Sequence, residues 1–460
     1  MAHIDNPMRF LKLILLVAFV GVTGVAIKAG PSSEPEAVVL IIGDQHSAYE
    51  RTAQLVAAID QLKAAHPALA LAIMLNGDTF EYGNIVARRS EGAVDFAMFA
   101  ALARRAPTIL NLGNHEPEFF DLAETVRRVQ ATGVTVISTI VNRATGQPFA
   151  SAFTRVKLGR AEATVVGVTT DKLSTYRLAV RPSLDLANPV AWAKQNFPAI
   201  IGAASVPVVL SHAGLNADRE MLPLVPAGTL FAGAHDHQRF VHPQGRGAYV
   251  QSGSWNEYLT LAWLHRDAAG LPVWRVEQIE IPANGPADAA LAELIRETRR
   301  KFLTPEDSAI VGHSPTLMAP GAAARFVTGR LRTSAAVDAA FIGNTTFGAG
   351  LPAGGISRVE FDACIRFDGT IYTAEVEGAR LQTLLAEANQ GPDQAFEKRR
   401  GEYLVAVGPE QIDPAKRYRI ATTDWGARNT EAYFGVPAIV WQEQPGQKFK
   451  ARVLAGLGKP

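Results

Sequence analysis

The segment Val38-Val39-Leu40-Ile41-Ile42-Gly43-Asp44-Gln45-His46 joins five consecutive apolar residues to a glycine and two potential metal ligands. A short apolar run that ends at a glycine is typical of a buried strand. A helical pattern over residues 52–65 and a second apolar run over residues 69–75 follow it. This order of strand, helix and strand predicts an α/β fold in which helices cover parallel strands.

The same alternation continues to residue 137 and then changes. Helical patterns over residues 94–103 and 122–130 alternate with apolar runs over residues 108–110 and 134–137. Beyond residue 150 the sequence contains spaced strand-like runs at residues 163–168, 206–210, 229–231, 248–251 and 259–264. We expect these later runs to form a second sheet that packs on the first.

A boundary is expected near Pro282. The stretch from Pro282 to Pro286 has the composition of a linker, and a helical pattern follows it. A mixed α/β pattern then continues to the end of the chain. The sequence therefore predicts a first domain over residues 36–282, a linker helix over residues 283–303 and a smaller α/β (α+β) domain over residues 304–460.

The first thirty residues have the pattern of a signal peptide. Arg9 and Lys12 precede an uncharged apolar run over residues 13–27, which is shorter than the ~20 residues that span a bilayer. We expect residues 1–30 to be removed on export, which predicts a periplasmic or extracellular protein. The alternative is an uncleaved N-terminal anchor, and only then would the protein be attached to a membrane.

Charge and cysteine content exclude two classes of site. The 460 residues carry a formal net charge of +1, so a field that would hold a nucleic-acid polymer is not expected. Cys364 is the only cysteine, which excludes a disulfide within the chain and a thiolate metal cluster. Any bound metal must therefore use oxygen and nitrogen ligands.

Potential ligands follow five of the apolar runs. In an α/β sheet, ligands bind where the carboxyl ends of the strands meet. The five segments at these ends are Gly43-Asp44-Gln45-His46, Asn76-Gly77-Asp78, Gly113-Asn114-His115-Glu116, Ser211-His212 and Gly233-Ala234-His235-Asp236-His237. They predict a cluster of carboxylate, imidazole and amide groups along one rim of the fold.

These residue types suit two divalent cations, with zinc, manganese and iron as the candidates. In an extended turn the Asp-x-His spacing of Asp44 and His46 would put both side chains on one face. Asp78 lies between two such pairs in the sequence. We expect its two oxygens to bridge cations roughly 3.5–4 Å apart, the spacing that clamps a transferred phosphoryl group.

In this order the motifs resemble the calcineurin-like metallophosphoesterase superfamily over about residues 38–264. The exported chain, linker helix and second domain are similar to the 5′-nucleotidase family, as are the segments at residues 341–346 and 418–424. The resemblance implies a four-layer αββα catalytic domain over residues 36–282 and a substrate-binding domain over residues 304–460. Between them it implies a cleft that selects the group attached to the phosphate.

The resemblance also implies ligand and catalytic roles. One metal would be held by Asp44, His46, Asp78 and His237, and the other by Asp78, Asn114, His212 and His235. His115 would stabilise the developing charge or protonate the leaving oxygen. Glu118 would hold the His115 ring, unless Pro117 reshapes the turn so that Asp121 replaces Glu118.

The expected substrate contacts lie in the second domain. The family uses arginines to bind phosphate and two aromatic rings to enclose a base. The candidates here are Phe347, Tyr433, Phe434, Arg428 and Asn344. Core packing is the alternative role for the three aromatic residues, and the family's Gly-Gly-Asp-Gly segment is replaced here by residues 428–432.

These features predict metal-dependent hydrolysis of a small phosphate ester, with a nucleotide monoester as the leading substrate. Cyclic nucleotides, nucleotide sugars and thiosulfonate esters are alternatives on the same chemistry. A protein phosphatase is disfavoured, because Gly77-Asp78-Thr79-Phe80-Glu81 lacks the Asp-Arg-Gly continuation of that class. The alternative from another class is an exported binding protein that keeps its metals without turnover.

Overall fold

The computed structural model describes residues 34–457 of the chain. The predicted signal peptide, residues 1–30, lies outside the described residues. Within residues 34–457, no helix has both the length and the apolar character that crossing a bilayer requires.

The first sheet has six strands in the order β14-β13-β1-β2-β3-β4. Four of them are parallel, namely β1 (Ala37–Ile42), β2 (Ala70–Asn76), β3 (Thr108–Asn111) and β4 (Thr135–Ile137). The antiparallel strands β13 (Tyr258–Arg266) and β14 (Pro272–Glu280) extend the sheet beside β1.

One strand lies in a different sheet from the one expected. The run at residues 259–264 was expected in the second sheet, but it forms β13 and pairs with β1, with Ala262 opposite Val39. A buried apolar run satisfies either sheet equally well, because both faces of each sheet are covered. The sequence pattern therefore predicted the strand but could not predict its partner.

The second sheet also has six strands, in the order β11-β12-β10-β9-β7-β6. They are β6 (Phe153–Leu158), β7 (Ala161–Thr169), β9 (Val206–His212), β10 (Leu230–Gly233), β11 (Arg239–Gln244) and β12 (Gly247–Ser252). Strands β7, β9, β10 and β12 are parallel, and β6 and β11 pair antiparallel at the two edges. A short two-stranded pair consists of β5 (Val141–Asn142) and β8 (Leu184–Asp185).

Strand β1 shows why the apolar run that begins the fold is uninterrupted. Val39 and Ile41 pack into the core between the two sheets, whereas Val38, Leu40 and Ile42 pack into the core beneath the helices. Because successive side chains alternate between the faces of a strand, a strand with two covered faces must be apolar at every position. All six residues of β1 are buried.

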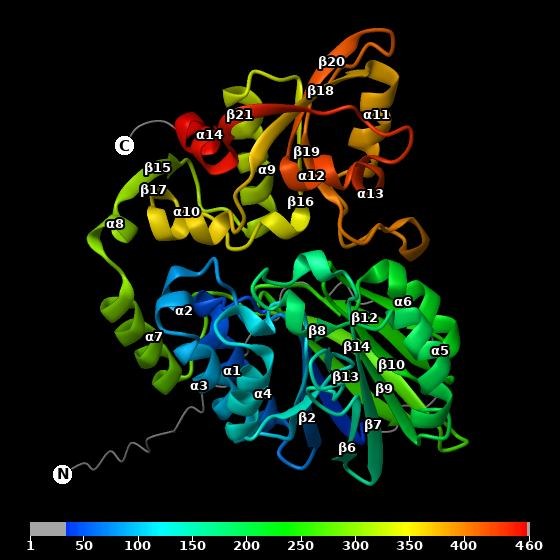
Figure 1. Ribbon diagram of the computed structural model, residues 1–460. Helices are drawn as coiled ribbons and strands as arrows, with labels where there is room; N and C mark the ends of the chain where they lie inside the picture. The colour runs from blue at the N-terminus through cyan, green and yellow to red at the C-terminus, as the bar shows by residue number, and fades with distance from the viewer. Residues whose placement is uncertain (1–33, 458–460) are drawn as a thin grey trace, which may run out of the picture. The chain divides into compact units, whose positions relative to one another are not determined.

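Helices cover the outer faces of both sheets (Figure 1). Those on the first sheet are α1 (Tyr49–Ala65), α2 (Ile85–Arg89), α3 (Ala93–Ala103) and α4 (Leu122–Ala131). Those on the second are α5 (Pro189–Ile200) and α6 (Leu215–Met221). The predicted αββα layers are confirmed.

Beyond α7 (Ala289–Phe302), residues 305–456 form a smaller mixed α/β arrangement. Its main sheet has the order β19-β16-β20-β18-β21, and β15 pairs with β17. The strands are β15 (Ile310–Ser314), β16 (Ala339–Gly343), β17 (Gly354–Ser357), β18 (Thr370–Glu377), β19 (Leu404–Val407), β20 (Arg417–Thr423) and β21 (Gln442–Lys448). The helices are α8 (Pro305–Ser308), α9 (Pro320–Ser334), α10 (Arg358–Cys364), α11 (Gly378–Glu387), α12 (Asp424–Arg428), α13 (Thr430–Phe434) and α14 (Phe449–Gly456).

The predicted second, smaller domain corresponds to this part, which we call the C-terminal half. Residues 34–282, where the resemblance implies catalysis, are called the catalytic half. The domain limits at residues 282 and 303 stay a prediction, because the described residues 34–457 group as one compact unit.

Two buried asparagines join the carboxyl ends of the two large sheets. Asn76 Nδ2 donates to the carbonyl oxygens of Ser211 at 3.0 Å and Ala232 at 2.9 Å. Asn111 Nδ2 donates to Asn76 Oδ1 at 3.1 Å and also to two carbonyl oxygens of the second sheet. The two sheets are therefore held together at the rim where the predicted ligands follow their strands.

We predict that Asn111→Ala lowers the free energy of unfolding by about 2–4 kcal/mol, because it leaves buried polar groups unpaired. Urea unfolding of the metal-free protein measures the change. Asn196→Ala is the control, since Asn196 makes a single bond within helix α5, to the Trp192 carbonyl. A loss for Asn111→Ala no larger than that of the control would contradict the bridging role.

Asp95 on α3 is a buried acid that meets the hydroxyl of Tyr49 on α1. The Tyr49 hydroxyl donates to Asp95 Oδ2 at 2.6 Å. Burial raises the pKa of Asp95 to about 7, although hydrogen bonds from Tyr49 and Ser47 oppose the shift. The folded protein therefore keeps a proton on Asp95 at pH values where the unfolded carboxyl group has lost it.

Because this folded-state pKa is raised, the contribution of Asp95 to stability is complete below about pH 4 and is lost as the pH rises to about 7. Asparagine does not titrate, so we predict that Asp95→Asn loses less stability than the native chain between pH 4.5 and 7.5. Urea midpoints at both pH values provide the test. Equal losses in the two proteins would contradict the prediction.

Candidate metal centre and active site

The structure brings all seven predicted ligands to one rim. Asp44 and His46 follow β1, Asp78 follows β2, Asn114 follows β3, His212 ends β9, and His235 and His237 follow β10. The side chains of six of them are almost fully buried, and that of His237 is 7% exposed. Five strand ends from two sheets thus supply one cluster of polar groups.

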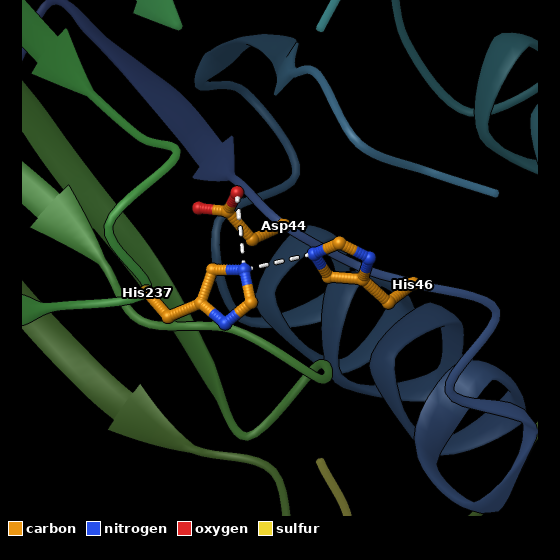
Figure 2. Close-up of side chains that lie close together, drawn as sticks. All are labelled: Asp44, His46 and His237. Atoms are coloured by element: carbon orange, nitrogen blue, oxygen red, sulfur yellow. Dashed lines mark hydrogen bonds and ion pairs between the residues drawn. The ribbon is translucent and has the colours of Figure 1, made fainter. Parts of the chain in front are cut away.

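The first group consists of Asp44, His46 and His237, whose side chains point toward one another (Figure 2). The Nε2 atoms of His46 and His237 lie 2.9 Å apart. Asp44 Oδ1 lies 3.8 Å from His237 Nε2. Three ligand atoms from two loops therefore converge closely enough to share one cation.

The second group consists of Asp78, His212 and His235. Asp78 Oδ2 lies 3.1 Å from His212 Nε2 and 4.0 Å from His46 Nε2, so Asp78 is placed between the two groups. The Nδ1 atom of His212 lies 2.7 Å from the Asn76 carbonyl oxygen. That hydrogen bond fixes the proton on Nδ1 and leaves Nε2 available as a ligand.

The donor set fits a pair of divalent cations. Within residues 34–457, Asn114 Oδ1 and His235 Nε2 are buried and have no hydrogen-bond partner. Such atoms are costly to bury unless something coordinates them. Imidazole nitrogens with carboxylate and amide oxygens suit zinc, manganese or iron. The assignment of four ligands to each metal, with Asp78 shared, stays a prediction.

The charges of three of the four candidate ligand histidines are consistent with cation binding, whereas, although burial opposes the shift, Asp78 raises the pKa of His212 to about 10. Burial lowers the pKa values of His46, His235 and His237, that of His235 to about 3. These imidazoles are therefore neutral at pH 7, which is the state that coordinates a metal. Burial also raises the pKa of Asp44, and the neighbouring Asp78 adds to this effect. Carboxylates crowded in this way are stabilised by bound cations.

The backbone at the ligands is not extended, so the geometric reason given for the Asp-x-His motif is wrong. Asp44, His46 and Asp78 have φ values of 49°, 49° and 53°, and His235 and His237 have φ values of 82° and 56°. All five lie in the left-handed region, which non-glycine residues seldom occupy. The side chains converge because tight turns redirect the chain, and not because alternate residues share one face.

Glycines and a buried glutamate allow two of these turns to pack together. A Cβ on Gly77 would lie 2.5 Å from His212 Nδ1, and one on Gly113 would overlap the Asp78 carboxylate. Glu116 accepts hydrogen bonds from the backbone of Gly113 at 2.6 Å and of Thr79 at 2.9 Å. The sequence motif contained Glu116, but only the structure shows that it joins the turns after β2 and β3.

His115 faces Glu118 and not Asp121. The His115 Nδ1 atom lies 2.9 Å from Glu118 Oε1. Asp121 caps helix α4, where its Oδ1 atom accepts from the Glu124 backbone N–H at 2.8 Å. Its carboxylate therefore caps the helix and does not hold the His115 ring. Although burial alone would lower the pKa of His115, Asp78 and Glu118 raise it well above its ordinary value. The ring is therefore placed to carry a proton.

Three further residues adjoin the ligands, and the sequence analysis gave them no role. Glu81 Oε2 lies 3.3 Å from His46 Nδ1. The Trp255 ring packs 4.4 Å from the His46 ring, measured between centroids. The Arg366 guanidinium lies 4.1 Å from the centre of the Trp255 ring. Trp255 and Arg366 are far from every motif in the sequence, so spacing alone could not have identified them.

A cavity of about 630 Å³ opens beside the candidate ligands. One side is lined by His46, Asp78, His115 and Glu118 of the catalytic half. The other side is lined by residues of the C-terminal half, among them Thr345, Arg366, Phe367, Glu402, Asp424 and Trp425. The candidate centre thus faces a space that both halves enclose.

The five predicted substrate residues do not line this cavity. Phe347 and Phe434 are packed in the cores of the C-terminal half, which is the alternative role considered for them. Tyr433 donates to Glu402 Oε2 at 2.7 Å, and Arg428 pairs with Asp424. The Asn344 amide donates to the Asp236 carbonyl oxygen at 2.9 Å. Their placement gives no support to direct substrate contact.

Comparisons with known proteins agree with this geometry. Residues 37–239 match the calcineurin-like phosphoesterase family. A 5′-nucleotidase precursor from Thermus thermophilus is similar in structure, with a TM-score of 0.61, 17% identity, and coverage of 92% of this chain and 96% of that one. No match was found among curated protein sequences.

Two further structures share the fold over most of the chain. The sulfate thiohydrolase SoxB of Thermus thermophilus has a TM-score of 0.67 and 14% identity, with coverage of 93% of this chain and 95% of that one. A 5′-nucleotidase from Candida albicans has a TM-score of 0.58 and 11% identity, with coverage of 92% and 98%. The fold and the site define a metal-dependent phosphoesterase. Residues 37–239 thus match the calcineurin-like phosphoesterase family, and the two-part fold of the chain is similar to that of the 5′-nucleotidases.

We predict that Glu118→Gln lowers kcat at least tenfold, because a positioned general acid contributes about 10²–10⁴-fold to rate and the variant loses the carboxylate that orients His115. The protonated ring is present below its raised pKa and is lost as the pH rises through it. Removing Glu118 lowers that pKa, so the alkaline limb of the pH–rate profile should move to lower pH. Asp121→Asn is the control, and an unmoved limb in Glu118→Gln would contradict the assignment.

Proposed function

We propose that the protein hydrolyses nucleotide monoesters, with Asp44, His46, Asp78, Asn114, His212, His235 and His237 holding two divalent cations. One observation carries the proposal, namely that one cavity is lined by five of these seven residues (His46, Asp78, Asn114, His235 and His237), by His115, and by Phe367 and Trp425. A phosphate at the donor set would therefore extend its organic group toward the C-terminal half. The fold shared with two 5′-nucleotidases supports the same substrate class.

Bound cations and His115 would have different roles in the hydrolysis. Bound divalent cations polarise phosphoryl oxygens and activate water. His115, with its ring held by Glu118, is placed to donate a proton to the leaving oxygen. The backbone N–H of His115 donates to Asp78 Oδ1 at 2.8 Å, so the proton donor and Asp78, which would help to hold the cations, are fixed relative to each other.

The C-terminal side of the cavity suits a nucleoside. Phe367 is 41% exposed, and its ring centroid lies 6.2 Å from that of His115, so an apolar ring face is available beside the site of proton donation. Trp425 adds a second aromatic surface, and the carboxylates of Glu402 and Asp424 can accept hydrogen bonds from hydroxyl groups. An aromatic base and a sugar diol offer the matching groups.

We propose in addition that the protein acts outside the cytoplasm, in the periplasm or extracellular space. The support is the signal-peptide pattern of residues 1–30. Sequencing the amino terminus of the protein recovered from its native host distinguishes cleavage near Ala29 from an uncleaved anchor.

The test of substrate class is phosphate release from nucleoside monophosphates, cyclic nucleotides, nucleotide sugars and an aryl phosphate, with zinc or manganese. A thiosulfonate ester releases no phosphate, so its hydrolysis is measured by the formation of its own product. We predict turnover of nucleoside monophosphates that Asp78→Asn abolishes and His115→Ala lowers by about 10²–10⁴-fold. Asp185→Asn, an exposed aspartate on β8, is the matched control and should keep native activity.

Each other outcome selects a different function. Preference for a thiosulfonate or a cyclic nucleotide would keep the metal chemistry and overturn the nucleotide monoester. Absence of turnover with every substrate, while calorimetry shows two bound cations, would replace hydrolysis by the binding-protein alternative.

A further inference from the structure

The segment at residues 390–403 of the C-terminal half packs against the second sheet of the catalytic half. The Phe396 ring stacks on the His242 ring at a centroid distance of 4.1 Å and an interplanar angle of 19°. Arg219 on α6 donates to the carbonyl oxygens of Phe396 and Arg399, the latter at 2.7 Å. The Arg399 guanidinium lies 4.2 Å from the centre of the Phe240 ring. The two halves are thus joined here by stacking and by hydrogen bonds.

This segment also holds the loop that carries two candidate ligands. The loop, residues 234–238, contains His235 and His237 and ends at Gln238. The Gln238 Nε2 atom donates to the carbonyl oxygens of Arg400 and Gly401, the latter at 2.5 Å. Arg399 Nη1 donates in return to Gln238 Oε1 at 3.2 Å. The Gln238 side chain, which directly follows His237, therefore has all its described partners in the C-terminal half.

Asn344 holds the middle of the same loop. Its Nδ2 atom donates to the carbonyl oxygen of Asp236 at 2.9 Å, and its Oδ1 atom accepts from the Tyr403 backbone at 2.9 Å. Gly401 packs so closely on the Asp236 carboxylate that a Cβ there would lie 3.0 Å from it. Asp236 separates the two ligand histidines, so this contact fixes the backbone between them.

The loop needs such support because its backbone is strained. The φ values of His235 and His237 are 82° and 56°, and a residue held in a sparsely populated conformation costs on the order of 1–3 kcal/mol. A conformation of that cost persists only where surrounding contacts fix it. Within the catalytic half the Gly253 backbone donates to the Gln238 carbonyl oxygen and the His235 backbone donates to Asp44. The C-terminal half adds a hydrogen bond from the Asn344 side chain to the Asp236 carbonyl oxygen. It also provides the hydrogen-bond partners of the Gln238 side chain, at residues 399–401.

Trp255 provides a second, separate connection. Its ring lies 4.4 Å from the His46 ring and 5.8 Å from the His237 ring, between centroids. Its Nε1 atom donates to the Phe347 carbonyl oxygen at 3.0 Å, and Arg366 covers the ring. Two ligand histidines of the first group therefore pack on a tryptophan whose indole N–H is held by the C-terminal half.

We propose that the C-terminal half is a structural part of the metal centre. Its Asn344, and Gln238 and Trp255 of the catalytic half, which the C-terminal half holds by hydrogen bonds, are positioning residues for His46, His235 and His237. This inference rests on the proposed function, because it takes these histidines as metal ligands. It gives the C-terminal half a role in metal retention that is separate from substrate selection.

The decisive variant is Asn344→Asp in the full chain. Aspartate can still accept from the Tyr403 backbone, but it cannot donate to the Asp236 carbonyl oxygen. Asn389→Asp is the matched control, since Asn389 also accepts from and donates to one backbone residue, Ala406, within the C-terminal half. Each zinc- or manganese-loaded protein is dialysed against increasing chelator, and the metal retained per chain is measured by elemental analysis.

We predict that the chelator concentration removing half of the metal falls about tenfold or more in Asn344→Asp, as when a group that orients a ligand is removed, and stays native in Asn389→Asp. Excess metal should restore the activity of Asn344→Asp, which a general folding defect would not allow. Thermal unfolding of the metal-free proteins should show equal stability for the two variants.

A second pair of variants keeps the inference testable if Asn344→Asp does not fold. Trp255→Phe keeps an aromatic ring against His46 but removes the indole donor and one of the two fused rings. Trp274→Phe is its control, because the Trp274 indole donates to the Gly228 carbonyl oxygen inside the catalytic half. Metal retention that is weaker in Trp255→Phe but native in Trp274→Phe supports the inference.

Native retention in both Asn344→Asp and Trp255→Phe, in a protein that binds two ions, would overturn the inference and leave the proposed function intact. If the native chain bound no metal, both the inference and the proposed function would be wrong.

Discussion

The structure depends on the burial of several carboxylates and imidazoles at one rim between two sheets. Asp78 lies 3.1 Å from His212 and 4.0 Å from His46, with almost no exposure to solvent. Burying charged groups is costly unless opposite charges or hydrogen bonds compensate them. Neutral imidazoles and crowded carboxylates supply the ligands of a divalent cation, so metal binding would turn this cost into a stabilising interaction.

The surrounding fold is arranged to permit that crowding. Gly77 and Gly113 allow two turns to approach within distances that a side chain would block, and Glu116 ties the turns together. Asn76 and Asn111 join the two sheets at the same rim. Polar residues therefore replace apolar ones where the strands end. Their hydrogen bonds hold the five ligand-bearing strand ends in a fixed arrangement, which a preorganised metal site requires.

The seven candidate ligands could be found from the sequence because each follows or ends an apolar run, and runs such as Val38 to Ile42 have two covered faces. The αββα layers followed from the same alternation. The partner of β13 could not be predicted, because an apolar strand fits either sheet. The cavity residues Phe367 and Trp425 lie outside any recognisable motif, and Phe347 lies in a core, because aromatic residues serve packing and binding alike.

The same contacts connect the cavity to the candidate metal centre. Arg366 and Phe367 are neighbours in the chain, and the first covers Trp255 behind His46 while the second faces the cavity beside His115. Gly401 and Glu402 are likewise neighbours, and the first packs on Asp236 while the second lines the cavity. A movement of either segment that reshaped the cavity would also move a support of the ligand loops. Under the proposed function, some substitutions in these two segments should therefore change substrate preference and weaken metal binding at the same time. This is expected although the cavity and the metal centre bind chemically different groups.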